Sequence, residues 1–80
     1  MEKQFDVVDF IMAFEGGDIS EADIVYGIQT MINDGSVWQL QGFYGRTAQS
    51  LIDEGFCMPQ GKWSPTEARE AFEEYVAFHP

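Results

Sequence analysis

Residues 20–35 carry the strongest helix signals in this chain of 80 residues and constrain the fold most. Ser20 followed by Asp23 resembles a capping box in which Asp replaces the usual Glu or Gln, and Gly35 stands where left-handed backbone geometry ends a helix. The apolar residues between these ends have the i, i+1, i+4, i+7, i+8 spacing of one buried helix face: Ile24, Val25, Ile28, Met31 and Ile32. The segment therefore predicts an amphipathic helix with one face in a core.

Glycine and proline divide the rest of the chain into further helical segments. The first covers residues 5–14, where Asp6 can cap the start and Gly16-Gly17 ends the apolar pattern. The last covers residues 64–78, where Ser64, Pro65 and Glu67 occupy the cap, first and third helical positions.

The middle of the chain, residues 36–54, predicts a third helix that is broken near Gly42 and stops at Gly55. A β-hairpin over residues 37–44 is the weaker alternative, because Gln39, Gln41 and Gly42 interrupt the alternation that a strand needs. We therefore expect an all-α fold: one small compact domain over residues 1–80, with about four helices.

The composition excludes several classes of site and partner. One Cys cannot form an internal disulfide, and one His leaves too few ligands for a zinc site. No apolar run approaches the roughly 18 residues of a membrane span, and the N-terminus lacks the basic-then-apolar order of a signal peptide. We expect a cytosolic protein that does not enter a membrane, with Cys57 a reduced, buried thiol.

The charge of the chain is strongly negative and unevenly distributed. Four Lys and Arg against fourteen Asp and Glu give a net charge of −10, which argues against direct binding to nucleic acid. Residues 1–35 alone hold eight acids and one lysine, a net charge of −7. Acidic side chains also improve solubility and favour helix N-termini, which explains part of this excess. The remainder suggests an acidic face that docks on a basic partner surface, made of Asp6, Asp9, Glu15, Asp18, Glu21 and Asp23.

Such a face raises the question of nucleic-acid mimicry. A domain of this size spans roughly 25–30 Å, and duplex DNA of that length carries about 15–18 charges. Ten net charges spread over a whole surface are a diluted imitation of DNA unless most of them gather on one side.

No residue pattern in the chain indicates catalysis, a cofactor or a metal. The carboxylate pairs, such as Asp6 with Asp9, have the spacing of a solvated helix face. His79 stands next to the C-terminus without a recognisable partner, and Cys57 lies between two apolar residues, as expected of core. We expect a protein that is not an enzyme.

Three residues in the middle of the chain are candidates for a short-range anchor to a partner: Trp38, Tyr44 and Arg46. Trp, Tyr and Arg are the residue types enriched in interface hot spots. The alternative places Trp38 in the core with Phe43, and pairs Arg46 with an acid such as Asp34 or Asp53. For Trp38 we favour the core; for Tyr44 and Arg46 the two interpretations are balanced.

The segment from Trp38 to Ala48, followed by Leu51-Ile52 and Gly55, resembles a group of short, uncharacterised bacteriophage-encoded proteins. Their shared pattern is an acidic helix, then Trp-x-Leu-Gln-Gly-x-Tyr-Gly-Arg-Thr-Ala, then Leu-Ile-x-x-Gly. The similarity covers residues 8–58, so that residues 1–58 form a family-like core and residues 59–80 a linker with a C-terminal helix.

The resemblance implies a phage product in the cytoplasm of an infected bacterial host. Small acidic phage proteins of this kind commonly bind a host or defence protein, such as a CRISPR effector, an RNA polymerase or a nuclease. We therefore expect an inhibitor that docks its acidic face on a basic protein surface, with an anti-CRISPR role as the most specific form. The alternative is a self-associating structural or adaptor protein, such as a homodimer, suggested by the wide apolar stripe of the first helix.

Overall fold

Four α-helices and one short 3-10 helix make up the fold in the computed structural model, which describes residues 5–78. In chain order they are α1 (Val7–Gly16), α2 (Glu21–Asp34), the 3-10 helix η1 (Ser36–Gln39), α3 (Gly42–Asp53) and α4 (Pro65–Phe78). The all-α prediction is confirmed, and the break expected near Gly42 falls at Leu40 and Gln41. The hairpin alternative is wrong, because residues 37–44 form most of η1 and the first turn of α3.

The predicted helix starts are made by local hydrogen bonds. Asp6 Oδ1 accepts from the backbone N–H of Val8 at 2.9 Å and of Asp9 at 3.3 Å, and Ser20 Oγ accepts from Asp23 N at 3.1 Å. Ser64 and Glu67 form a reciprocal capping box ahead of α4, at 3.0 and 3.1 Å. These side chains satisfy N–H groups that have no partner within the helix.

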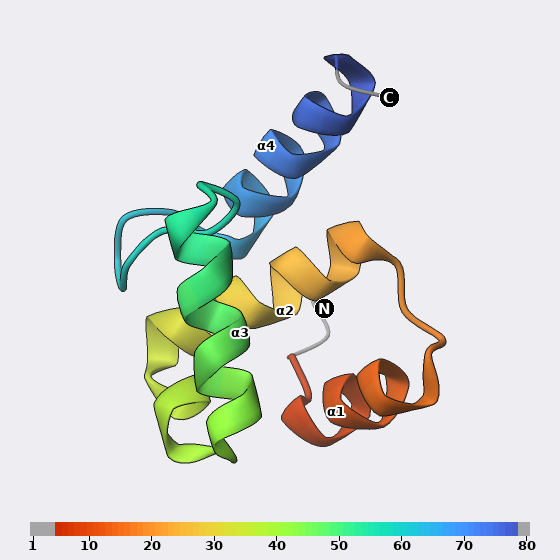
Figure 1. The fold of residues 1–80 in the computed structure, drawn as a ribbon, viewed down its shortest axis with the longest axis vertical. Coiled ribbons are helices and arrows are strands. Elements are labelled where there is room, and N and C mark those ends of the chain that lie inside the picture. The colour runs from red at the N-terminus through yellow and green to blue at the C-terminus, as the bar shows by residue number, and fades with distance from the viewer. Residues whose placement is uncertain (1–4, 79–80) are drawn as a thin grey trace.

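Helix α2 is the centre of the arrangement, with α1, α3 and α4 placed around it (Figure 1). Four residues of its predicted apolar face are buried, Val25, Ile28, Met31 and Ile32, and the fifth, Ile24, is half-buried. Cys57 and Ala68 complete this core from the loop after α3 and from α4. Helix α4 packs on α2, and only its C-terminal end projects beyond the other helices (Figure 1).

The segment between α3 and α4 is bound to α2 through Asn33. Asn33 Oδ1 accepts from Gln29 Nε2 at 3.0 Å and from Gly61 N at 3.2 Å, and Asn33 Nδ2 donates to Trp63 O at 2.8 Å. This linker therefore packs on the body of the domain and carries α4 into contact with α2.

Helix α1 is docked on α2 by a close approach between Phe10 and Gly27. The Phe10 ring is buried against α2, and a Cβ atom placed at Gly27 would overlap it. Glycine at this position thus lets an aromatic ring reach the α2 backbone, which sets how α1 lies beside α2.

Candidate functional site

A groove of about 480 Å³ lies between α1 and α2 and is reached by one residue of α4. Its lining combines apolar and charged side chains: Phe5, Asp6, Asp9, Phe10, Ala13, Asp18, Ile19, Asp23, Tyr26 and Arg69. Four of the six acids that the sequence suggested for a binding face therefore gather around one groove. Asp6 and Asp9 lie at the start of α1 and Asp23 in the first turn of α2, while Asp18 lies in the loop between the two helices.

The four groove carboxylates have different surroundings. The Asp6 carboxylate is engaged in capping α1, and Asp23 Oδ1 lies 3.9 Å from Arg69 Nη1. Asp9 and Asp18 are exposed and form no ion pair with any residue between 5 and 78. Among the described residues, these two carboxylates therefore have no cationic partner.

The structure places the other two predicted acids elsewhere. Glu15, at the end of α1, accepts a hydrogen bond from the Tyr44 hydroxyl at 2.9 Å. Glu21, at the start of α2, borders a separate hollow with Phe72 of α4. Both side chains are exposed but neither lines the groove.

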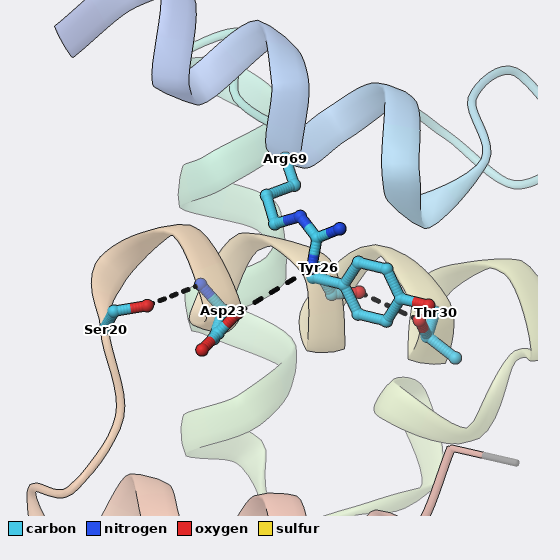
Figure 2. A network of polar contacts seen from close by, with 5 residues as sticks. All are labelled: Ser20, Asp23, Tyr26, Thr30 and Arg69. Atoms are coloured by element: carbon cyan, nitrogen blue, oxygen red, sulfur yellow. Dashed lines mark hydrogen bonds and ion pairs between the residues drawn. The ribbon is translucent and has the colours of Figure 1, made fainter. Parts of the chain in front are cut away.

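Arg69 and Tyr26 are groove residues that the sequence analysis did not identify. Figure 2 shows Arg69 reaching from α4 to α2, where its Cζ lies 4.7 Å from the centroid of the Tyr26 ring. One turn after Tyr26 on α2, Thr30 Oγ1 donates to the Tyr26 carbonyl at 2.8 Å. The i, i+3 spacing of Asp23 and Tyr26 is visible in the sequence, but nothing local marks Arg69 as their neighbour.

Tyr44, one of the candidate anchors, lies in the interior of the domain. Tyr44 is only 4% exposed, its ring packs on Phe14 and Phe43, and its hydroxyl is bound to Glu15. Burial first, and then the hydrogen bond and negative charge of Glu15, raise the pKa of the Tyr44 hydroxyl. Tyr44 and Arg46 are two residues apart on one helix and so point to nearly opposite sides. They cannot form one anchor.

Trp38 and Arg46 are both on the surface. Trp38 is 50% exposed, so its expected place in the core is wrong; one edge of its ring packs near Gly45. Arg46 is exposed, and its guanidinium folds back over Gly42. Arg46 forms no ion pair within residues 5–78, where Asp34 and Asp53 instead accept from Ser36 N and Gln49 Nε2. Phe43, also expected in the core, is another exposed aromatic residue beside them in the sequence.

The thiol of Cys57 lies away from the groove. Cys57 is buried as expected and points at the Val25 carbonyl, 3.7 Å from its Sγ, and burial raises the pKa of the thiol to about 12. His79 lies outside the described residues. In the part of the chain that the structure describes, no three His, Cys, Asp or Glu side chains are grouped as metal ligands.

Within residues 5–78, no helix is both long and apolar enough to cross a membrane. No curated protein and no solved structure matches the chain. A family model described as a domain of unknown function (DUF7417) matches residues 1–75, a range that includes α1, α2, α3 and most of α4. The chain therefore belongs to the DUF7417 family.

Proposed function

We propose that the protein is a small acidic binding domain, without catalytic activity of its own, that docks on a basic surface of another protein and blocks it sterically. The observation that carries this proposal is the gathering of Asp6, Asp9, Asp18 and Asp23 around one groove. Carboxylates are strongly hydrated, so a cluster of them beside apolar side chains favours a partner that brings compensating positive charge.

The overall charge supports the same kind of partner. A net charge of −10 is carried by a body whose principal extents are 33 × 27 × 25 Å. A field of this kind raises the association rate with a basic surface and repels acidic ones. The negative charge is locally concentrated at the groove, because Asp9 and Asp18, which line it, are not neutralised by a cation of the described chain.

Exposed aromatic and basic side chains supply a second part of the proposed contact. Trp38, Phe43 and Arg46 belong to η1 and α3, at a surface distinct from the groove. Residues of these types provide much of the short-range energy in protein interfaces. Their contribution would survive high salt, whereas the contribution of the groove would not.

The biological setting that we propose rests on the resemblance of residues 38–48 to short phage proteins. It is the cytoplasm of an infected bacterium, where the protein inhibits or redirects a host or anti-phage defence protein. An effector that holds nucleic acid in a basic channel, as CRISPR effectors do, is the most specific partner of this kind. Nucleic-acid mimicry would then be local, limited to the groove and its rim.

The test is affinity capture of the tagged protein from bacterial lysate, washed at low and at high salt, followed by reconstitution with the purified partner. Asp9→Asn with Asp18→Asn should slow association and flatten its salt dependence. Glu70→Gln with Glu74→Gln is the matched control, because it removes two exposed acids outside the groove. Association rates that are equal for wild type and both variants would rule out electrostatic docking through the groove.

Self-association is a second candidate function, supported by exposed apolar side chains. Val8 and Met12 lie one turn apart on the outer side of α1, and Tyr75, Val76 and Phe78 are exposed on α4. Sedimentation over micromolar concentrations tests it: a monomer throughout removes the candidate, while a dimer that Val76→Ser dissociates supports it.

A further inference from the structure

We infer that the groove between α1 and α2 binds an arginine side chain of the partner, and that Arg69 fills one end of it in the free protein. The inference rests on the proposed function, which requires a basic partner, and adds the chemical group that is recognised. It follows from the contacts that the Arg69 guanidinium makes with Tyr26 and Asp23 in the groove.

Arg69 shows the mode of binding. Its guanidinium carbon lies 4.7 Å from the Tyr26 ring centroid, and its Nη1 lies 3.9 Å from Asp23 Oδ1 (Figure 2). An aromatic face and a carboxylate are the two partners that a planar guanidinium uses best, since it stacks through its plane and donates at its edge. Asp23 and Tyr26, one turn apart on α2, therefore form half of a guanidinium site.

Arg69 is held loosely enough to be displaced or shifted. The distance of 3.9 Å is long for an ion pair, and the Arg69 and Asp23 side chains are 37% and 59% exposed. Exposed pairs of this kind contribute about 0–1 kcal/mol. A partner arginine can thus compete with Arg69 at little cost in stability.

The rest of the groove is large enough, and acidic enough, to hold the partner residues on either side of that arginine. Its volume of about 480 Å³ is in the range of ordinary ligand sites, roughly 300–1,000 Å³. Phe5, Phe10 and Ile19 contribute apolar surface that suits the aliphatic stem of an arginine. Asp9 and Asp18 add two carboxylates that have no cation within residues 5–78.

Arginine is favoured over lysine by the same geometry. The lysine ammonium is compact and strongly hydrated, and it cannot stack its charge flat on the Tyr26 ring. We therefore expect the groove to prefer arginine-rich to lysine-rich peptides of equal charge, and Tyr26→Leu to remove that preference.

The experiment measures binding of fluorescein-labelled nona-arginine and nona-lysine to the full chain by fluorescence anisotropy. Asp9→Asn with Asp18→Asn should weaken nona-arginine binding about tenfold, as expected when two exposed ionic contacts are lost. Glu70→Gln with Glu74→Gln makes the same change in net charge away from the groove and should have a clearly smaller effect.

Arg69→Gln gives the sharper test. It removes the internal competitor and should tighten nona-arginine binding by about threefold or more, the reverse of what loss of an ordinary contact does. Lys62→Gln is its control, because Lys62 is exposed on the linker and its loss changes the net charge equally. Circular dichroism of each variant checks that the helices remain.

Three results overturn the inference: equal binding of the two peptides by wild type, equal effects of groove and control acids, or no difference between Arg69→Gln and Lys62→Gln. The second result leaves the proposed function intact, since an acidic surface without a defined groove would still bind a basic partner. Failure of the proposed function is seen separately, when no partner with a basic surface is captured from lysate.

Discussion

The side chain of Gln29 and the backbone of Met58 form a reciprocal pair of hydrogen bonds in the interior of the domain. Gln29 Nε2 donates to Met58 O at 2.9 Å, and Met58 N donates to Gln29 Oε1 at 2.8 Å. Gln29 is fully buried on α2, and its side-chain amide satisfies both the N–H and the C=O of Met58 in the loop after α3. A buried polar side chain is tolerated in this core because its amide oxygen and nitrogen are both hydrogen-bonded.

We predict that Gln29→Leu lowers the free energy of unfolding by roughly 2–3 kcal/mol, since it leaves the backbone groups of Met58 without partners. Gln49→Leu is the control, because Gln49 is exposed and its side chain donates to Asp53, one turn away. Its cost should be within about 0.5 kcal/mol. Urea unfolding measures both values, and a similar cost for the two variants would contradict this role of Gln29.

We predict that Gly27→Ala destabilises the domain by about 1–3 kcal/mol, because the added methyl group overlaps the Phe10 ring and forces α1 away from α2. Gly16→Ala, where the methyl group meets only ordinary contacts, should be close to neutral. In a Phe10→Ala background the cost of Gly27→Ala should largely disappear. If it persists there, the Phe10 ring is not its cause.

We predict that Tyr44→Phe costs about 1 kcal/mol by removing the hydrogen bond to Glu15, and leaves partner and peptide binding unchanged. The second half follows from the burial of Tyr44. A double-mutant cycle with Glu15→Gln isolates the coupling between α1 and α3. A binding defect in a folded Tyr44→Phe protein would restore Tyr44 as a contact residue.

We predict that stability falls as the pH rises above about 9, where the unfolded chain loses the Cys57 proton. Burial raises the pKa of this thiol from 9.0 to about 12, so the folded protein keeps the proton that the unfolded chain releases. The contribution is complete below pH 9 and declines toward pH 12, with a slope of up to about 1.4 kcal/mol per pH unit for one proton. The raised pKa of Tyr44 acts in the same direction above pH 10.

Urea unfolding between pH 7 and 11 measures this slope. Cys57→Ala should be less stable than wild type at neutral pH, since it leaves space in the core, but its stability should decline less over this alkaline range. Equal slopes in the two proteins would show that the thiol is not the group responsible.

The part of the fold that depends on near neighbours in the chain could be predicted from the sequence. The caps at Asp6, Ser20 and Ser64 involve groups two or three residues away, so their residue types alone identify them. The spacing of Ile28, Met31 and Ile32 likewise identifies the buried face of α2, because helix geometry relates these positions wherever the helix lies.

The candidate site was predicted only in part. The excess of acids in the first part of the chain marked six candidate residues. Four of them line the groove, whereas Glu15 and Glu21 do not. The packing of α1 on α2 decides which of these side chains face one another. Tyr44, one of the candidate anchors, is buried, since residue type does not say which side of α3 meets α1.

The sequence by itself determined the helices, their ends and the excess of negative charge, since these depend on local geometry and on composition. Tertiary packing alone decided that Gln29 is buried and that Arg69 lies on Tyr26 and Asp23. Both outcomes depend on contacts between segments far apart in the chain, whose energies are set only when the helices pack. The groove and the guanidinium within it are consequences of that packing.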